Sequence, residues 1–307
     1  MNNLSFHVAH LELTSKCNFQ CDFCPIDDIS RPSQIMKKEL AFRLVEEIAK
    51  NSLAKVIVYQ QLGEPLLVPY LGELMEFSSQ LGLKNRIGTN GLLLSKKKNL
   101  GHILKHCDNL DIGIRASNQE ELSSICKNKN IVFDNYLDGI KLFLAERLKQ
   151  NSEIVITLRL FIGELTQQIL NKIGIDYSLN STPLMVPIEH KGLFLYFEDC
   201  LDRNWTEVKN NHSRHIGTCE EFFYSVVILA NGDMTTCCWD YDGQNTFGNI
   251  HSDNNIIAVL SGKKYLNARK LFSKNVVPFK LCATCSRLNK KVYFEKNLSK
   301  PLEYSHE

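Results

Sequence analysis

The stretch "CNFQCDFC", residues 17–24, decides the fold. It places Cys17, Cys21 and Cys24 in a C-x3-C-x2-C order, directly after the apolar run "HLEL" (10–13), which is typical of a strand. Three thiols on one short loop can bind a single metal centre, whereas a structural zinc site needs four protein ligands. The loop therefore favours an iron–sulfur cube with one open iron. A zinc loop completed by a residue elsewhere in the chain is the alternative.

The bulk composition is that of an ordinary globular protein. The chain has 307 residues, of which 44% are hydrophobic and 23% charged, and its net charge of +2 implies no field for a polyanion. No apolar run of about 18 residues and no secretory signal is present. Eleven cysteines in such a chain favour metal or redox chemistry over disulfides. We therefore expect a cytoplasmic protein with neither a nucleic-acid nor a membrane partner.

Up to about residue 190, short apolar runs alternate with segments of helical periodicity. This rhythm predicts an α/β fold with a parallel sheet, in the form of a partial (β/α)6 barrel. Functional groups are then expected on the loops after the carboxyl ends of the strands. The expected strands cover 10–13, 55–59, 85–91, 110–117, 153–162 and 184–188, and the expected helices cover 38–51, 70–82, 95–107 and 133–150.

The pattern changes after residue 190, where the sequence becomes polar and irregular as far as about 218. The run "YSVVILANGDMTTCCWD" (224–240) then predicts a β-hairpin, because Asn231-Gly232 is a strong turn pair. A helix is expected at 254–272. We predict a barrel domain at 1–210, a small domain of hairpin plus helix at 211–290, and a polar tail at 291–307.

The cysteine order, with Phe23 before its last cysteine, resembles that of the radical S-adenosylmethionine (SAM) superfamily. The resemblance covers residues 8–190, and it implies that the open iron binds SAM. The reduced cluster then cleaves SAM to a 5′-deoxyadenosyl radical, which takes a hydrogen atom from a substrate. Cofactors carry this step, while the protein positions and shields it.

Further loops carry the same resemblance and imply contacts to SAM. "QLGEPLL" (61–67) is similar to the family's GGEP motif, with Leu62 in place of the first glycine, and "GTNG" (88–91) follows the next strand. Ordinary turns, and for Arg159 a buried ion pair, are the alternatives. The implied cofactor-binding residues are Gly63, Glu64, Pro65, Thr89, Asn90, Arg115, Ser117 and Arg159.

A second set of cysteines lies near the carboxyl end: Cys219, Cys237, Cys282 and Cys285. Four thiolates satisfy either zinc or a fully ligated iron–sulfur cluster. The layout resembles the SPASM/twitch extension of radical SAM enzymes, in the twitch form found in 2-deoxy-scyllo-inosamine dehydrogenase. The resemblance implies two [4Fe–4S] clusters, one binding SAM and one auxiliary.

Two residues are candidates for catalysis. Cys238 neighbours a cluster ligand, and its thiol is either a hydrogen donor or a small buried side chain. Arg203 lies between the two predicted domains, where it is a candidate base or hydroxyl-orienting group, or part of a solvated loop. Cys107, Cys126 and Cys200 are expected to be inert core residues.

The resemblance leaves two reactions open. The first is oxidation of a small polyol or aminosugar, with the auxiliary cluster as electron acceptor. The second is epimerisation or maturation of a ribosomally made peptide, with Cys238 as hydrogen donor; we expect no separate leader-binding domain before residue 17. A flavodoxin- or ferredoxin-type reductant is implied in both. A non-enzymatic zinc-binding module remains as a third class.

Overall fold

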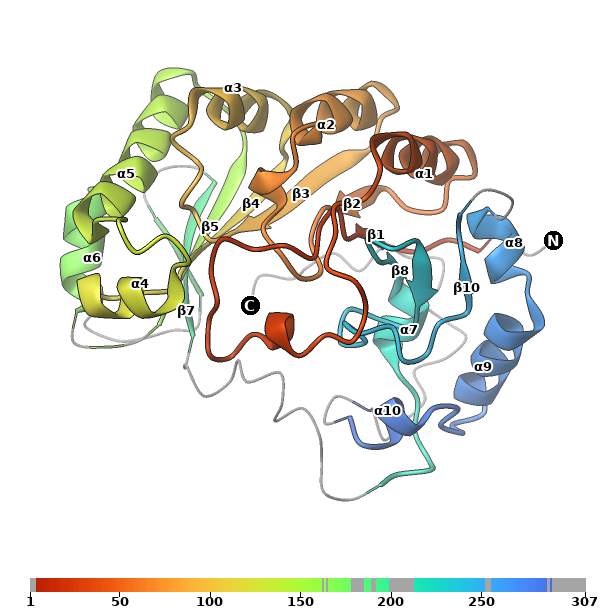
Figure 1. Ribbon diagram of the computed structural model, residues 1–307. Helices are drawn as coiled ribbons and strands as arrows, with labels where there is room; N and C mark the ends of the chain where they lie inside the picture. The colour runs from red at the N-terminus through yellow and green to blue at the C-terminus, as the bar shows by residue number, and fades with distance from the viewer. Residues whose placement is uncertain are drawn as a thin grey trace.

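The computed structural model describes residues 4–161, 163, 165–177, 185–188, 192–198, 213–251, 255–285 and 288. All named strands of this described part belong to one sheet, in the order β10-β9-β8-β1-β2-β3-β4-β5-β7-β6. Figure 1 shows this curved sheet with helices along its outer side. The predicted α/β partial barrel is therefore confirmed.

Parallel pairing joins the strands of the barrel. Each strand from β1 to β5 pairs in parallel with the next, β5 pairs in parallel with β7, and β6 is an antiparallel edge strand. The strands are β1 (Val8–Leu11), β2 (Val56–Val58), β3 (Lys84–Thr89), β4 (Asn109–Ile114), β5 (Val155–Phe161), β6 (Met185–Pro187) and β7 (Leu193–Glu198).

Helices between these strands cover the outer face of the sheet (Figure 1). They do so because one side of each is apolar: in α1, Leu40, Leu44 and Ile48 are buried at helical spacing, as the sequence predicts. The helices are α1 (Lys38–Lys50), α2 (Leu71–Gln80), α3 (Lys97–His106), α4 (Gln119–Ile125), α5 (Phe133–Lys149) and α6 (Thr166–Ile173).

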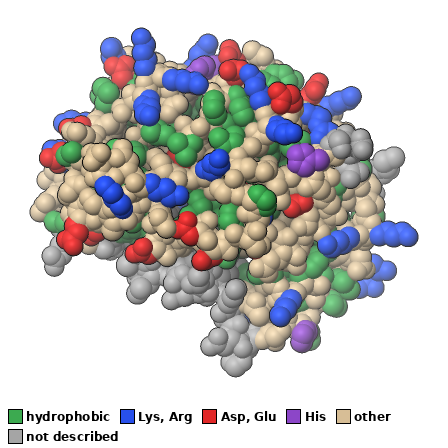
Figure 2. Space-filling view, viewed as in Figure 1, with side chains coloured by type: hydrophobic (Ala, Val, Ile, Leu, Met, Phe, Trp, Pro, Cys, Tyr) green, Lys and Arg blue, Asp and Glu red, His purple; other side chains and the backbone are tan. Residues whose placement is uncertain are grey.

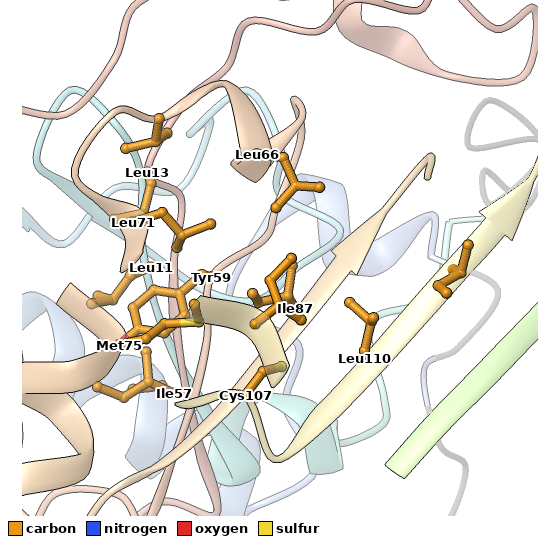
Figure 3. Packing of buried hydrophobic residues seen from close by; sticks show 14 of the residues in the cluster. Leu11, Leu13, Ile57, Tyr59, Leu66, Leu71, Met75, Ile87, Cys107 and Leu110 are labelled. Carbon is orange, nitrogen blue, oxygen red and sulfur yellow. The ribbon is translucent and has the colours of Figure 1, made fainter. Parts of the chain in front are cut away.

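The core lies between these helices and one face of the sheet. Figure 3 shows Ile57 of β2, Tyr59 just after β2 and Ile87 of β3 in the same apolar cluster as Met75 of α2. Tyr59 is buried, and its hydroxyl donates to Oδ1 of Asn85 over 3.0 Å. The buried phenol is thus satisfied, as a core hydroxyl must be.

The carboxyl-terminal part extends the same sheet. β8 (Ser225–Ile228) pairs in parallel with β1 and antiparallel with β9 (Asp233–Thr235), as the predicted hairpin requires. Gly232 in its turn has φ +85°, a conformation that favours glycine. The remaining elements are β10 (Gly248–Asn249), α7 (Glu220–Tyr224), α8 (Ile256–Leu260), α9 (Lys263–Ser273) and α10 (Lys280–Ala283).

Two local expectations were wrong. Residues 193–198, expected to be irregular, form β7, whose alternate residues Leu193, Leu195 and Phe197 are buried. The single helix expected at 254–272 is instead α8 followed by α9, because Gly262 between them has an extended backbone (φ −71°, ψ 147°).

The described surface carries charges of both signs. In Figure 2, Lys and Arg side chains are interspersed with Asp and Glu side chains over the face that is drawn, in keeping with the small net charge. Within the described part of the chain, no helix is long and apolar enough to cross a membrane.

Candidate cluster and cofactor site

The first cysteine loop starts at the carboxyl end of β1, and its three thiols are half-buried. The amide of Cys24 donates to the carbonyl of Cys21 over 2.9 Å, which closes a tight turn. Burial, with smaller contributions from the neighbouring thiols, raises the pKa of both Cys17 and Cys21 to about 12. The protein alone therefore does not favour thiolates here, and a bound metal group would have to stabilise them.

The first cysteine loop borders a cavity at one of its three thiols, that of Cys17. Among the described residues, no three His, Cys, Asp or Glu side chains are arranged to hold a single metal ion. A cavity of about 560 Å³ borders Cys17 and is also lined by Lys16 and Lys127. Next to Cys17, Nδ2 of Asn18 is buried without a hydrogen-bond partner. A cube fits better than zinc, because each cysteine binds a different iron and cluster sulfurs accept hydrogen bonds.

The loop after β2 packs directly on the cysteine loop. Gly63 has φ +76°, and a Cβ there would lie 2.3 Å from the carbonyl oxygen of Thr14, so only glycine fits. The amide of Glu64 donates to the carbonyl of Lys16 over 2.9 Å, and Pro65 begins the short 3-10 helix η2 (Pro65–Leu67). Leu62, which stands where the motif has glycine, is buried.

Glu64 joins this loop to the next one. Its buried carboxylate accepts hydrogen bonds from Thr89 Oγ1 (2.8 Å), the amide of Asn90 (2.8 Å) and the amide of Leu66 (3.0 Å). Burial raises its pKa to about 7, and the hydrogen bonds oppose that rise. Asn90 Nδ2 in turn donates to Asn18 Oδ1 over 2.8 Å and lies 3.8 Å from the Cys17 sulfur. The predicted SAM-binding loops thus converge on the cysteines.

Arg115 and Ser117 follow β4 and have different surroundings. Ser117 donates its amide to Glu121 of α4 over 2.7 Å. The guanidinium of Arg115 lies over the rings of Phe23 and Phe161. Burial raises the pKa of the Cys21 and Cys24 thiols, and Arg115 opposes the rise at both.

The inner face of the sheet is polar. Strand register places His10, Arg86, Asp111 and Arg159 on the face opposite the helix-covered core. Asp111 accepts from Arg86 over 2.7 Å and from Arg159 over 3.4 Å, and the Arg159 guanidinium lies 4.8 Å from the centre of the Tyr196 ring. Arg159 therefore takes part in an ion pair that is only partly buried, and its predicted contact to SAM stays a prediction.

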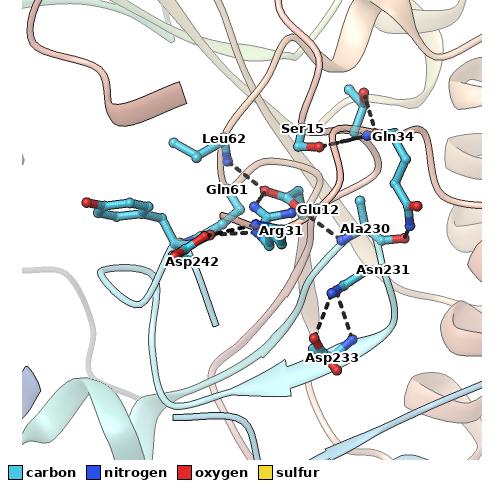
Figure 4. A network of polar contacts seen from close by, with 12 residues as sticks. Glu12, Ser15, Arg31, Gln34, Gln61, Leu62, Ala230, Asn231, Asp233 and Asp242 are labelled. Atoms are coloured by element: carbon cyan, nitrogen blue, oxygen red, sulfur yellow. Dashed lines mark hydrogen bonds and ion pairs between the residues drawn. The ribbon is translucent and has the colours of Figure 1, made fainter. Parts of the chain in front are cut away.

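Glu12 is the centre of a buried polar network (Figure 4). Arg31 binds it through two parallel hydrogen bonds of 2.7 and 2.5 Å, and the side chains are 5% and 0% exposed. The amides of Leu62 (3.3 Å) and Ala230 (2.8 Å) also donate to this carboxylate. One charge thus holds together the cysteine loop, the loop after β2 and the carboxyl-terminal hairpin.

Other contacts strengthen the same junction. Asp242 accepts from the amide and the hydroxyl of Ser30, both over 2.7 Å, and Arg31 Nε donates to the carbonyl of Tyr241 over 2.8 Å. Gln61 Nε2 donates to the carbonyl of Cys238. Sequence reasoning missed Glu12, Arg31 and Asp242, because no local motif marks residues whose partners are distant in the chain.

The second set of cysteines belongs to the carboxyl-terminal part of the sheet and its helices, and its role as one ligand set stays a prediction. Burial and the neighbouring thiols Cys237, Cys219 and Cys285 raise the pKa of Cys282, so these groups lie within electrostatic range of one another. Cys219 precedes α7, Cys237 follows β9, and Cys282 and Cys285 belong to α10 and its end.

The surroundings of this second set also fit a cluster. Arg214 holds α10 through the carbonyls of Cys285 and Leu288. Three buried donor atoms have no protein partner: Arg214 Nε, Thr218 Oγ1 and Asn245 Nδ2. Each belongs to a segment that carries or supports a cysteine, where cluster sulfurs would accept their hydrogen bonds.

The remaining predicted residues divide into two groups. Cys107 and Cys126 are buried, in agreement with an inert role, and Cys238 is half-buried. Arg203 and Cys200 lie outside the described residues. The catalytic roles of Arg203 and Cys238 stay predictions.

Comparison with known proteins agrees with both cysteine groups. The family model of the radical SAM superfamily matches residues 11–171. That of SPASM, an iron–sulfur cluster-binding domain, matches residues 219–286.

Two curated relatives match part of the chain. An S-adenosylmethionine-dependent nucleotide dehydratase of Flammeovirga pacifica is 33% identical over 93 residues (29% of this chain, 31% of that protein). A probable GTP 3′,8-cyclase of Saccharolobus islandicus is 33% identical over 134 residues (43% and 41%). The chain therefore spans less than half the length of these relatives.

Solved structures share the fold over most of the chain. BtrN in complex with AdoMet and 2-DOIA superposes with a TM-score of 0.54 at 17% identity, with 88% of each chain covered. Streptococcus suis SuiB bound to the precursor peptide SuiA superposes with a TM-score of 0.59 at 14% identity, with 92% of this chain and 70% of that chain covered. At these identities the likeness concerns the fold.

Breaking the Glu12–Arg31 pair is expected to destabilise the protein strongly. Arg31→Met leaves a buried carboxylate without its cation, which costs about 3–5 kcal/mol. Urea unfolding checks this value, with Lys38→Met as the control. The Lys38–Glu73 pair is 46% and 58% exposed, so its loss should cost about 1 kcal/mol or less. Equal losses in the two variants would contradict the role given to Glu12.

The pKa of Glu64 predicts a pH dependence of stability. Folding raises the pKa of the Glu64 carboxyl from 4.5 to about 7. Its contribution to the free energy of unfolding is therefore complete below pH 4.5 and is lost as the pH rises to 7. Over this pH range, the free energy of unfolding of the wild type should fall by up to about 3 kcal/mol relative to that of Glu64→Gln. Urea unfolding at several pH values measures this difference. If the free energies of unfolding of the two proteins changed in parallel with pH, the result would argue against a buried carboxyl at position 64.

Iron analysis tests the two cysteine groups separately. Anaerobically reconstituted protein should hold about eight iron atoms, the content of two [4Fe–4S] clusters. Cys282→Ala should lower this to about four, because it removes a ligand of the second cluster alone. Cys107→Ala, which changes a buried thiol outside both groups, should leave the iron unchanged. Zinc in place of iron would contradict the assignment.

Proposed function

The chain belongs to the radical SAM superfamily, and we propose that it oxidises a small polyol or aminosugar by removing a hydrogen atom from a C–H bond. Its cofactors are SAM, a SAM-binding iron–sulfur cluster and an auxiliary iron–sulfur cluster. We assign Cys17, Cys21 and Cys24 to the first cluster. The second is assigned to the four cysteines of the carboxyl-terminal part, Cys219, Cys237, Cys282 and Cys285.

The observation that carries this proposal is the match of the SPASM iron–sulfur cluster-binding domain to residues 219–286, a range that contains all four of these cysteines. A cluster with four thiolate ligands has no open iron for binding a substrate. Electron transfer is the role that remains for it. One cluster that cleaves SAM, together with a second cluster that only accepts an electron, suits a net oxidation of the substrate.

The oxidation balances in atoms and electrons. When bound, SAM and its cluster supply the hydrogen-atom abstraction. To become a ketone, an alcohol loses one hydrogen atom from carbon to the deoxyadenosyl group, one hydroxyl proton to a base and one electron to the auxiliary cluster. A flavodoxin- or ferredoxin-type protein provides the electron that starts each cleavage.

The protein's own residues position the substrate and the proton. The polar inner face, with Arg86, Asp111 and Arg159, suits a substrate rich in hydroxyl or amino groups. Burial lowers the pKa of His10 on the same face, which keeps its ring neutral and able to accept a proton. Arg203 remains the base, or the group that orients the hydroxyl, proposed from the sequence.

Fold comparison is compatible with a small molecule and with a peptide as the substrate, because anSMEcpe, solved with bound AdoMet and Cp18Cys peptide, is covered to 87%. BtrN was solved with AdoMet and 2-DOIA, and this chain covers 88% of it. SuiB was solved with a precursor peptide, and this chain covers 70% of it.

One contact favours a second candidate, an epimerase or a peptide-modifying enzyme. The carbonyl of Cys238 accepts a hydrogen bond from Gln61, the residue before the Leu62-Gly63-Glu64-Pro65 turn. Cys238 is therefore held beside a predicted SAM-binding loop, where a thiol is suited to return a hydrogen atom to a substrate radical.

Turnover of Cys238→Ala separates the two candidates. With dithionite and SAM, the wild type should form 5′-deoxyadenosine. With a polyol or aminosugar substrate, a dehydrogenase should yield ketone at an undiminished rate in Cys238→Ala. An epimerase should instead lose turnover in this variant and take solvent deuterium into the inverted carbon in the wild type. Absence of 5′-deoxyadenosine from fully reconstituted wild type would refute both.

A further inference from the structure

Arg115 lies against two aromatic rings beside the first cysteine loop. Its guanidinium carbon is 5.8 Å from the ring centre of Phe23 and 5.6 Å from that of Phe161. The two rings stand edge to face, with 5.7 Å between their centres. Phe23 lies between Cys21 and Cys24, and Phe161 ends β5. The side chain of Arg115 is thereby held next to the cluster-binding thiols by contacts with aromatic rings.

The backbone of β4 makes room for this position. A Cβ added to Gly113 would lie 2.5 Å from Nε and Nη2 of Arg115 and 2.6 Å from its Cζ. The guanidinium therefore folds back over a residue that has no side chain. Any larger residue at position 113 would push the cation away from the two rings.

A fixed positive charge at this place has a definite electrostatic effect. Reduction adds one negative charge to an iron–sulfur cluster, and net charge near the cluster is one of the factors that set its potential. A nearby cation stabilises the reduced form more than the oxidised one. The charge of Arg115 lies beside this part of the cysteine loop, because its guanidinium carbon is 5.8 Å from the ring centre of Phe23, which stands between Cys21 and Cys24 in the sequence.

We propose that Arg115 is a positioning residue that raises the reduction potential of the SAM-binding cluster by holding its charge beside Cys21 and Cys24. This role replaces the contact to SAM expected from the sequence, and it rests on the proposed function, which supplies the cluster. It would make the cluster easier to reduce for the protein that delivers the electron.

A redox titration of the reconstituted holoenzyme, followed by electron paramagnetic resonance, tests the proposal. In Arg115→Gln, the ratio of reduced to oxidised SAM-binding cluster at a given ambient potential should fall about tenfold, which is 59 mV for a one-electron couple. Arg115→Lys should keep most of the wild-type reduction potential, because it keeps the positive charge. SAM affinity and the potential of the auxiliary cluster should stay unchanged, which makes the second cluster an internal reference.

Gly113→Ala gives an independent perturbation, because it displaces the guanidinium while leaving its charge in the protein. It should shift the potential in the same direction as Arg115→Gln. Gly101→Ala is the matched control, since an added Cβ at Gly101 meets no atom within 4 Å. This control should behave as the wild type.

The outcomes are distinguishable. An unmoved potential in both Arg115→Gln and Gly113→Ala, with normal cluster signals, overturns the proposal and leaves the proposed function intact. Loss of SAM affinity with an unmoved potential also overturns it and assigns Arg115 to the cofactor. A wild type without any cube-type signal overturns the proposed function and this inference together.

Discussion

The structure depends on compensating one buried negative charge, that of Glu12. A carboxylate with no solvent exposure is stable only when donors surround it, and here Arg31 and two backbone amides supply them. These donors come from three loops far apart in the sequence. Satisfying Glu12 therefore requires the cysteine loop, the loop after β2 and the hairpin to meet at the end of β1. The proposed SAM site lies where they meet.

The parts that could be predicted are those encoded locally. Periodic apolar residues such as Leu40, Leu44 and Ile48 define α1, and the Asn231-Gly232 pair defines a hairpin turn. Cysteine spacing likewise marks both of the proposed metal-binding regions. For the helix, the turn and the first cysteine loop, the determining physical interactions act between residues that are close in the sequence.

The parts that could not be predicted depend on distant partners. Nothing near Glu12 in the sequence indicates that Ala230 will donate to it, and nothing near Arg159 identifies Asp111 as its partner. β7 was missed because its preceding residues give no regular signal, although pairing with β5 stabilises it. The break at Gly262 was missed because a glycine also occurs within helices, and its backbone conformation is set by how α8 and α9 pack.

The unbroken pairing from β1 through β8 to β10 bears on how this protein could be engineered. The carboxyl-terminal strands complete the hydrogen bonding of β1, so removing them would expose an unpaired strand edge. The carboxyl-terminal strands therefore do not form a unit that can be removed without disturbing β1. A chimera that transplanted this segment onto another barrel would have to bring the first strand and its acidic residue with it, and the two parts would have to be exchanged as one unit.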